Sequence, residues 1–315
     1  RFAAVFTAFA AAMLGLVTTN NTLSLYLFWE LTTVFSFLLI GHNYHTSVSR
    51  RAAMQAIILT TAGGLAMLVG IIILGELPGG SYEITELLAS IQSNRLGVDQ
   101  LTGHTATALL NTAIVLLMAG AFTKSAIIPF HFWLPAAMAA PTPVSAYLHA
   151  AAMVKAGVYL VARFAPGFAG YPIWQIGIPL FGICTLLLGG YRALRQYDLK
   201  LVLAFGTVSQ LGLLMILVGY GTSAMLLAGL MMLLAHALFK SALFLSIGII
   251  DWAVGTRDLR QLTGLRKKMP VTALFSALAG ASMMGLPPFA GFVAKEAALH
   301  TLIGSDFRAT ITWIA

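Results

Sequence analysis

Five lysines lie within or at the edge of long apolar segments, where a charge is expensive. They are Lys124, Lys155, Lys200, Lys240 and Lys295. On insertion scales, one lysine at the centre of a bilayer costs about 2.5–3.5 kcal/mol. Burial disfavours the charged form of lysine and a nearby carboxylate favours it, so lysines at such positions are suited to taking up and releasing protons. Lys200 follows Asp198 at the start of its segment, and we expect its side chain to snorkel to the interface.

Glu30 is the only carboxylate in the middle of an apolar segment, and its natural partner is one of the buried lysines, of which Lys124 is the best candidate. Lys124 lies five residues before Pro129, which has no N–H and leaves the carbonyl of Ser125 without its helical partner. Pro135 repeats the interruption after His131-Phe132-Trp133-Leu134. The sequence therefore predicts a broken helix beside the lysine.

A second break is predicted at Gly285-Leu286-Pro287-Pro288, shortly before Lys295. Irregular backbone is tolerated at membrane depth only where it faces protein or a hydrated cavity. Two broken helices in matching positions of two halves indicate a transporter built from repeats, with its pathway at the breaks.

Two histidines occur in the middle of apolar segments. His236 and Lys240 are four residues apart and share a helix face. His149 and Lys155 are six apart, so they point away from each other and do not imply one shared site. Histidine titrates near neutral pH and can bridge proton transfers. A structural ion pair would explain one or two of the buried cations, but the buried acids are too few to neutralise all of them.

Composition defines the class of the chain. Its 315 residues are 59% hydrophobic and 9% charged, and the mean hydropathy is +0.90. A soluble domain is typically about a quarter charged. Recurrent runs of roughly 20 apolar residues, without the alternation of a barrel, predict an all-α polytopic membrane protein. The single cysteine, Cys184, excludes a disulfide framework, a thiolate zinc site and an iron–sulfur cluster.

The apolar segments predict about ten transmembrane helices, the last of them truncated. The segments are Phe2–Thr19, Leu23–Gly41, Ala52–Gly75, Thr107–Leu134, Val144–Phe164, Ile173–Tyr191, Leu199–Gly219, Ser223–Ile250, Val271–Ile303 and Ala309–Ala315. They divide into two five-helix halves, residues 1–165 with the broken helix 107–134 and residues 172–315 with the broken helix 271–303. Both ends fall in apolar runs, which indicates a fragment of a longer chain. Ile84, Leu87, Leu88 and Ile91 predict a short amphipathic surface helix between the third and fourth segments.

The net charge of +8 comes from basic residues in short loops, so it indicates membrane orientation and no nucleic-acid partner. Alternate threading puts ten Lys and Arg on one side and three on the other, which makes the first side cytoplasmic. That side carries Arg50, Arg51 and the loop Arg257–Lys268. Nothing indicates an enzyme: there is no nucleophile elbow, nucleotide fingerprint or metal-spaced cluster, so no catalytic residue, metal or cofactor is expected.

Three motifs resemble a known family. They are Thr123-Lys124-Ser125 with Pro129-Phe130-His131-Phe132-Trp133-Leu134-Pro135, then Ala140-Pro141-Thr142-Pro143-Val144-Ser145-Ala146-Tyr147-Leu148-His149, and His236-Ala237-Leu238-Phe239-Lys240. They resemble the proton-pumping antiporter-like family, which includes the large membrane subunits of NADH:quinone oxidoreductase and of Mrp-type sodium/proton antiporters. The likeness covers essentially the whole chain.

Within that family, the chain looks most similar to the A-type component of Mrp. Met153-Val154-Lys155-Ala156-Gly157 and the stretch from Gly248 to Asp258 carry this likeness. Trp252 departs from an expected histidine, whereas Ala136 and Ala139 replace acids of the respiratory relatives and favour Mrp.

The resemblance implies two inverted five-helix repeats and roles by position. Glu30 and Lys124 would be the coupled pair, and Lys155, His236 and Lys240 the central hydrophilic axis. Lys295 would be the outlet or the handover to a neighbouring subunit. The implied protein is a proton-translocating subunit of a multisubunit sodium/proton antiporter in the cell membrane.

The implied partners are other membrane subunits, protons, monovalent cations and the lipid bilayer. The alternatives are a proton-pumping subunit of respiratory NADH:quinone oxidoreductase, a membrane scaffold that transports nothing, and a haem-type redox protein, against which the presence of only two mid-segment histidines argues.

Overall fold

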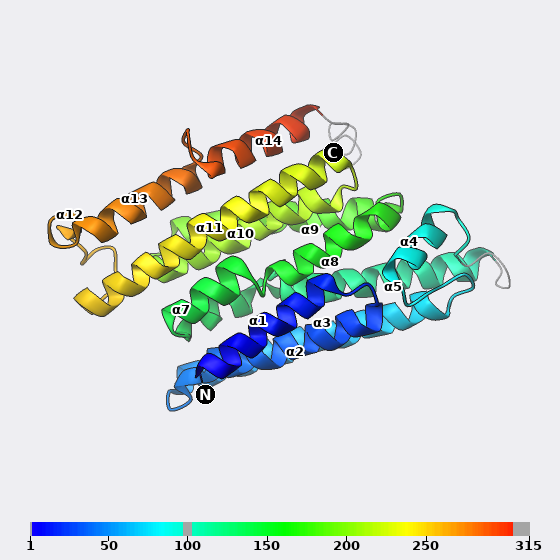
Figure 1. Ribbon diagram of the computed structural model, residues 1–315, viewed down its shortest axis with the longest axis horizontal. Coiled ribbons are helices and arrows are strands. Elements are labelled where there is room, and N and C mark those ends of the chain that lie inside the picture. The colour runs from blue at the N-terminus through cyan, green and yellow to red at the C-terminus, as the bar shows by residue number, and fades with distance from the viewer. Residues whose placement is uncertain (1, 97–102, 305–315) are drawn as a thin grey trace.

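A computed structural model of the chain describes residues 2–96 and 103–304. Within these ranges the chain is helical and has no β-strand, only two isolated β-bridges, Asn21 with Glu83 and Asp198 with Asp258. The helices run side by side along the long axis of the molecule and form one bundle (Figure 1). The all-helical class predicted from the sequence is confirmed.

The first part of the bundle consists of four long helices. They are α1 (Phe2–Thr18), α2 (Thr22–Ile40), α3 (Ser47–Glu76) and α5 (Gly103–Lys124). Side chains that accept hydrogen bonds fix two of the starts: Asn21 caps α2 by accepting from the amides of Leu23 and Ser24, and Thr46 caps α3. The helix α3 packs against both α2 and α5, so three helices that meet at Glu30 and Lys124 lie together.

The amphipathic helix predicted between the third and fourth apolar segments is confirmed as α4 (Ile84–Gln92). Ile84, Leu87 and Ile91 are buried, and the helix packs on α8 (Lys155–Phe168). Glu83 ties its start to the loop between α1 and α2 by accepting from the side-chain amides of Asn20 and Asn21 at 3.0 and 3.2 Å. Figure 1 shows α4 at one end of the bundle, beside the end of α8.

The break predicted after Lys124 is present, and the structure differs from the prediction in the extent of this break and in a second interruption. The expected helix 107–134 ends at Lys124, and a chain of short elements follows: a 3-10 turn (Phe130–Phe132), α6 (Trp133–Ala136), a second 3-10 turn (Ala137–Ala139) and α7 (Thr142–Ser145). The expected helix 144–164 is also interrupted, because a π-helical stretch (Ala146–Ala151) stops before α8 begins at Lys155.

Local hydrogen bonds explain how these interruptions are tolerated. The hydroxyl of Ser125 donates to the carbonyl of Val154 at 2.6 Å, so the break after α5 and the break before α8 lie against each other. The amide of Ile128 donates to the Thr185 hydroxyl at 3.0 Å. Irregular backbone inside a membrane protein needs such partners. The interruption before α8 has no proline or glycine at 152–154 that would mark it in the sequence.

The second part of the bundle contains α9 (Pro172–Leu194), α10 (Leu199–Gly219) and α11 (Ser223–Val254). After a short turn of helix, α12 (Leu265–Lys268), the chain forms α13 (Pro270–Met284) and α14 (Ala290–Gly304). Both α13 and α14 pack against α11 and lie along one edge of the bundle (Figure 1). The predicted segment 271–303 is therefore two helices, separated at residues 285–289.

Seven helical stretches in the described part of the chain are long and apolar enough to cross a membrane. They cover Thr22–Asn43, Ser47–Glu76, Ala106–Lys124, Thr142–Phe168, Pro172–Leu194, Leu199–Gly219 and Ser223–Val254. Phe2–Thr18 and Pro270–Met284 are shorter apolar helices. The chain is a multi-pass membrane protein, while the count of ten helices stays a prediction, since Ala309–Ala315 lies outside the described residues.

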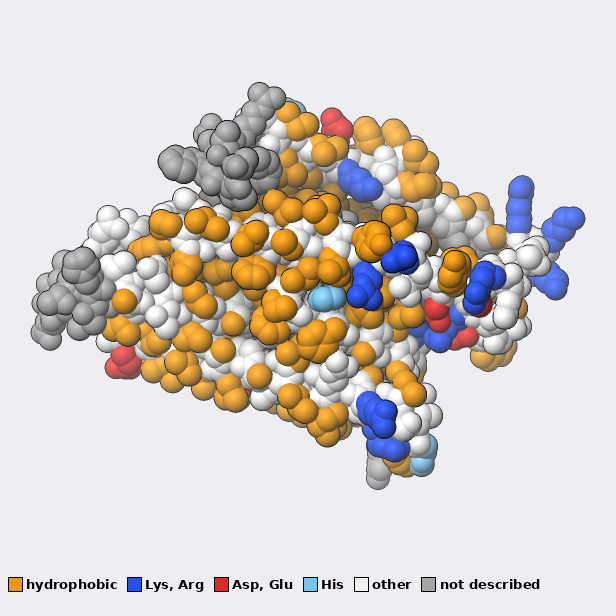
Figure 2. Space-filling view, turned by 180° about the vertical axis from the view of Figure 1, so that it is seen from behind, with side chains coloured by type: hydrophobic (Ala, Val, Ile, Leu, Met, Phe, Trp, Pro, Cys, Tyr) orange, Lys and Arg blue, Asp and Glu red, His pale blue; other side chains and the backbone are white. Residues whose placement is uncertain are grey.

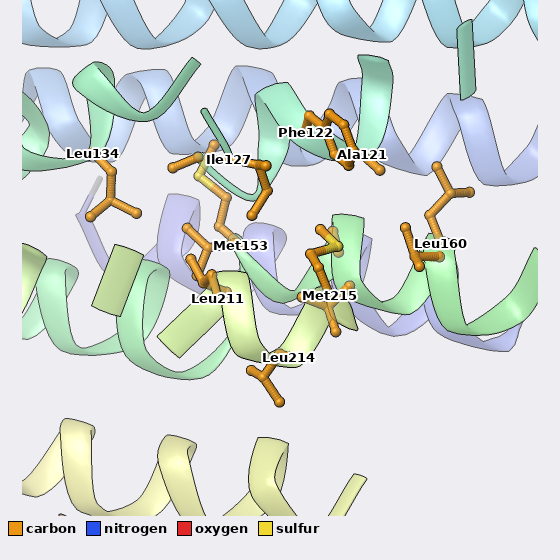
Figure 3. Packing of buried hydrophobic residues seen from close by; sticks show 14 of the residues in the cluster. Ala121, Phe122, Ile127, Leu134, Met153, Leu160, Leu211, Leu214 and Met215 are labelled. Atoms are coloured by element: carbon orange, nitrogen blue, oxygen red, sulfur yellow. The ribbon is translucent and has the colours of Figure 1, made fainter. Parts of the chain in front are cut away.

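The surface and the interior fit this placement. Figure 2 shows apolar side chains covering the middle of the molecule, with Lys and Arg gathered toward one end. Inside, apolar side chains of α5, α8 and α10 meet around the first break (Figure 3). Phe122, Ile127, Met153, Leu211 and Met215 are at most 4% exposed, so the break is enclosed by a packed core and held in one conformation.

Candidate proton-transfer site

Four of the five lysines are buried. Lys124 is 0% exposed, Lys155 5%, Lys200 2% and Lys240 3%, whereas Lys295 is only partly buried. None of the four makes an ion pair among the described residues, where the ion pairs join Arg257 to Asp198 and Asp251 and Arg260 to Asp258. Buried ammonium groups without a carboxylate at contact distance are rare in structural roles, because the desolvation cost is not returned by pairing.

Lys124 is the last residue of α5, and its ammonium reaches across to α2. Its Nζ donates to the backbone oxygen of Trp29 at 3.0 Å and to Oγ1 of Thr33 at 2.7 Å. The same atom lies 5.2 Å from the centre of the Trp29 ring. Glu30 directly follows Trp29 on α2, so the two members of the predicted pair, Glu30 and Lys124, lie in one site. In the described structure, however, no oxygen of Glu30 is within the 4.0 Å ion-pair distance of Lys124.

A second group lies among α8, α10 and α11. Lys155, at the start of α8, and Lys240, on α11, are close enough for their charges to repel each other. Both also lie near the His236 ring. Nζ of Lys240 donates to the carbonyl of Leu203 at 3.2 Å, while Nζ of Lys155 and both ring nitrogens of His236 have no hydrogen-bond partner among the described residues. The structure thus brings together the three residues that the family resemblance had assigned to a central axis.

His149 belongs to a different neighbourhood from Lys155. Its ring lies 6.0 Å from that of Trp133, and its electrostatic neighbour is Lys200. Both ring nitrogens of His149 are buried without a partner. His149 and Lys155 thus have different neighbours, as their spacing predicts. Buried polar atoms such as the ring nitrogens of His149 and Nζ of Lys155 are commonly hydrogen-bonded to ordered water in proteins.

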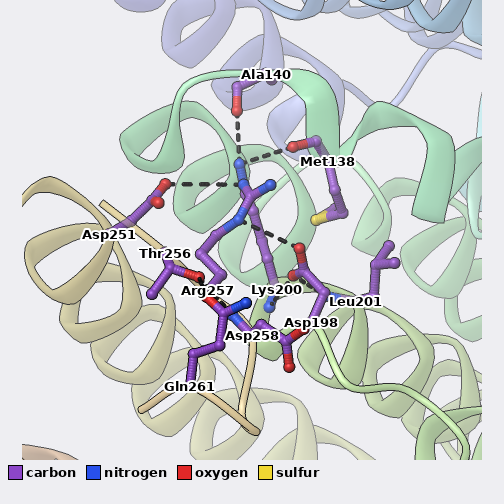
Figure 4. Close-up of polar contacts among 10 residues, drawn as sticks. All are labelled: Met138, Ala140, Asp198, Lys200, Leu201, Asp251, Thr256, Arg257, Asp258 and Gln261. Atoms are coloured by element: carbon purple, nitrogen blue, oxygen red, sulfur yellow. Dashed lines mark hydrogen bonds and ion pairs between the residues drawn. The ribbon is translucent and has the colours of Figure 1, made fainter. Parts of the chain in front are cut away.

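Lys200 corrects an expectation, because its side chain does not snorkel to the surface. Nζ donates to the carbonyls of Met138, in the second 3-10 turn, and of Ala140, directly after it, at 2.8 and 2.6 Å. Asp198 caps α10 by accepting from the amides of Lys200 and Leu201. Figure 4 shows the Lys200 side chain beside Arg257, reaching toward Met138 and Ala140. The carbonyls exposed by the irregular stretch 137–140 give the ammonium a partner nearer than water.

Arg257 joins the start of α10 to the end of α11 and lies beside Lys200. It pairs with Asp198 at 3.3 Å and with Asp251 at 3.8 Å, and all three side chains are about one third exposed. Beyond it, hydrogen bonds from Arg260 lower the pKa of Asp258 to about 2 in the loop after α11. Sequence reasoning missed this network. Asp198, directly before an apolar run, is an N-cap signal that points to it.

The four prolines that the sequence analysis placed at helix breaks lie in or beside the interruptions. Pro129 lies between α5 and the first 3-10 turn, and Pro135 sits inside the short helix α6. Pro287 and Pro288 lie between α13 and α14, and the bonds preceding Pro129 and Pro288 are cis. At the second break Lys295 turns back, and its Nζ donates to the carbonyls of Met283 and Met284 at 2.7 and 3.1 Å.

Sequence reasoning also missed two neighbours of the first break. Thr33 lies three residues after Glu30 and four after Trp29, so it faces the same way, and helical spacing could have found it. Gly64 on α3 leaves room for the Glu30 side chain, a contact between helices that no sequence spacing indicates. Among the described residues, no group of three or more His, Cys, Asp or Glu side chains is placed to hold a metal ion.

Buried lysines and interrupted helices inside a helical bundle define a multi-pass membrane protein with ionisable groups in its interior. Residues 19–314 match the family described as NADH:quinone oxidoreductase/Mrp antiporter, TM. Because the match covers most of the sequence, the chain belongs to this family.

Individual relatives agree with this assignment. The chain is 49% identical over 296 residues to the A/B component of a probable K(+)/H(+) antiporter of Rhizobium meliloti, covering 94% of the chain and 28% of that relative. It is 46% identical to the A component of the Na(+)/H(+) antiporter of Bacillus subtilis, covering 91% of the chain and 36% of that relative. The chain thus spans about a third of the length of these relatives.

A solved structure shows the same fold. The Mrp complex from Dietzia sp. contains a chain that is 42% identical, with a TM-score of 0.84. The match covers 93% of this chain and 31% of that one. The chain therefore spans about a third of the length of that chain.

Proposed function

We propose that this chain is the proton-translocating part of a subunit of a multisubunit monovalent cation/proton antiporter, with sodium as the exchanged cation. The observation that carries the proposal is the set of four lysines that are at most 5% exposed and have no ion-pair partner in the described structure. Such groups can change their protonation state at a low cost, since no countercharge fixes it. The name of the Bacillus subtilis relative supports sodium as the cation, and that of the Rhizobium meliloti relative, a probable K(+)/H(+) antiporter, supports cation/proton exchange.

The proposed proton path runs through the two groups of buried residues. Glu30 and Lys124 form one end, and Lys155, His236 and Lys240 the centre. His149 and Lys200 connect the irregular stretch 137–140 with the Arg257 end of the bundle. The family resemblance also assigns Lys295 an outlet or handover role, but its Nζ donates to the carbonyls of Met283 and Met284, so we place it outside this path as a cap of α13.

We further propose that residues 1–165 and 172–315 are two inverted repeats. Each holds one interruption of the kind that borders a lysine, after Lys124 in the first and before Lys295 in the second. Helix breaks at matching positions of two halves are typical of repeat-built transporters.

The basic end of the bundle, with Arg50, Arg51 and Arg257–Lys268, is proposed to face the cytoplasm. In a variant whose native Cys184 is replaced by serine, a cysteine at Gln261 should react with an impermeant maleimide only after the cells are opened. A cysteine at Ala89, on α4, should react in intact cells. Reaction of Gln261→Cys from outside would reverse the orientation.

The activity is tested on the full-length subunit in its complex. Everted vesicles from cells lacking their own antiporters should show proton movement on addition of sodium chloride, and less on addition of potassium chloride. Loss of that response in Lys124→Ala, at unchanged abundance, supports the proposal. The respiratory alternative, which the family description also includes, predicts instead proton movement that depends on quinone reduction and ignores the added cation.

A further inference from the structure

In this structure the ammonium of Lys124 is held by α2 and not by Glu30. It donates to the carbonyl of Trp29 and to Oγ1 of Thr33, and the Thr33 hydroxyl itself donates to the same carbonyl at 3.2 Å. Thr33 is 1% exposed, so water does not compete for this bond. The hydroxyl therefore accepts from the lysine while it is fixed by the backbone, which gives the ammonium a defined seat.

The Glu30 side chain lies in a different place, against α3. A Cβ at position 64 would overlap Oε1 of Glu30 and would come within 3.1 Å of its Cδ. The Glu30 carboxylate occupies this space only because residue 64 is glycine. Its Oε1 is buried and has no hydrogen-bond partner in the part of the chain that the structure describes. No polar contact therefore holds Oε1 in this slot, and the shape of α3 gives it room.

We propose that Thr33 and Gly64 are positioning residues that maintain a separated state of the pair, in which Thr33 seats Lys124 on α2 and Gly64 gives Glu30 a slot on α3. This inference rests on the proposed function, in which Lys124 carries the proton. A pair that must open and close needs a place for each partner when it is open, and the two places have different chemistry. The lysine keeps two acceptors, while Oε1 of the carboxylate keeps no donor.

The separated state therefore holds its two partners unequally, Lys124 by hydrogen bonds and Glu30 by space alone. An unpartnered buried carboxylate oxygen is costly, so the open state favours return of Glu30 to a cation. The seat at Thr33 offsets that tendency by keeping Lys124 on the backbone carbonyl. Without the hydroxyl the open state is populated less, and without the slot Glu30 has no room to leave the lysine.

The Thr33 seat is tested with two replacements of similar size. Thr33→Val removes the hydroxyl, whereas Thr33→Ser retains it. Sodium-dependent proton flux in vesicles, normalised to the amount of the protein in the complex, should fall about tenfold in Thr33→Val, as expected for the loss of one hydrogen bond to a charged group. Thr33→Ser should stay within about twofold of the parent. Equal flux in the two variants overturns this half of the proposal.

The Gly64 slot is tested by relief with a shorter acid. Gly64→Ala should lower flux strongly when residue 30 is Glu, but should cost little in the Glu30→Asp background, because the shorter side chain withdraws the carboxylate from the space that the new methyl group needs. Gly182→Ala is the matched control. Its Cβ would come within 2.7 Å of the Ile216 side chain, far from the pair, so its cost should be the same in both backgrounds.

The outcomes separate this inference from the proposed function. If Lys124→Ala retains full flux, the proposed function fails and takes the inference with it. If Lys124→Ala is inactive but Gly64→Ala costs the same in the parent and in the Glu30→Asp background, the inference alone is overturned. If Glu30→Asp is inactive by itself, the comparison of Thr33→Val with Thr33→Ser decides: a difference supports the proposal and equality overturns it.

Discussion

The two helix breaks look alike in the sequence and differ in the structure. Each has proline next to a non-helical stretch and a lysine within a few residues. At the first break Lys124 is fully buried and reaches another helix, where it meets Trp29 and Thr33 beside Glu30. At the second break Lys295 is only partly buried and turns back onto the last carbonyls of α13, which its own break has left unpaired.

This difference separates two uses of a lysine at a break. Donating to the free carbonyls at a helix end is a capping role, which needs a cation but no change of charge. Lys124 instead contacts two acceptors on a second helix, one residue from the partly buried Glu30, and this arrangement allows both its proton and its partner to change. A break near a lysine is therefore insufficient evidence of a proton site, and the partner of the lysine decides.

The largest effect is expected from replacing each of the two lysines by arginine. Arginine stays charged in proteins, so it can donate to carbonyls but cannot release a proton. Lys124→Arg should abolish sodium-dependent flux, whereas Lys295→Arg should retain about half or more of it. Both are measured in vesicles and normalised to abundance. If Lys295→Arg is as inactive as Lys124→Arg, the second lysine also transfers protons and the contrast between the breaks disappears.

A smaller but still large effect is expected in the central group. His236→Ala and Lys240→Ala should each lower flux about a hundredfold, since positioned proton-transfer groups typically contribute factors of this size. Neither should prevent membrane insertion, because each removes a polar group from the interior. Ser241→Ala, next to Lys240 on α11, is the control and should transport normally. Full flux in both variants would return His236 and Lys240 to a structural role.

The smallest effect is expected at Arg257. Its two ion pairs are about one third exposed, and each such pair is worth about 0–1 kcal/mol. Arg257→Gln should lower the thermal stability of the complex slightly and change flux less than about twofold, because Lys200 keeps its bonds to Met138 and Ala140. A loss of flux similar to that of Lys240→Ala would place Arg257 within the proton path.

The sequence predicted those structural features that depend on a single helix or a single break. Apolar length defined the spans, with Leu199–Gly219 matching its prediction at both ends. The missing N–H of Pro129 placed the first interruption, and the amphipathic spacing from Ile84 predicted α4. These features depend on local geometry, which a single segment determines.

What the sequence could not predict depends on contacts between distant segments. The interruption before Lys155 is held by a hydroxyl from Ser125, about thirty residues away, and has no proline of its own. Lys200 was expected at the surface because its position near a helix start permits it, but the carbonyls of the irregular stretch 137–140 bind it inside. The slot at Gly64 likewise exists only once α2 and α3 have packed.

The coupling between Glu30 and Lys124 is tested most directly by the flux of three variants against pH, normalised to abundance. Lys124→Ala should show no flux at any pH, and Glu30→Gln should retain part of it. The double variant should be no worse than Lys124→Ala, because the carboxylate acts only through that lysine and coupled residues are not additive. Normal transport by Lys124→Ala would contradict the mechanism, as would a double variant more active than either single change.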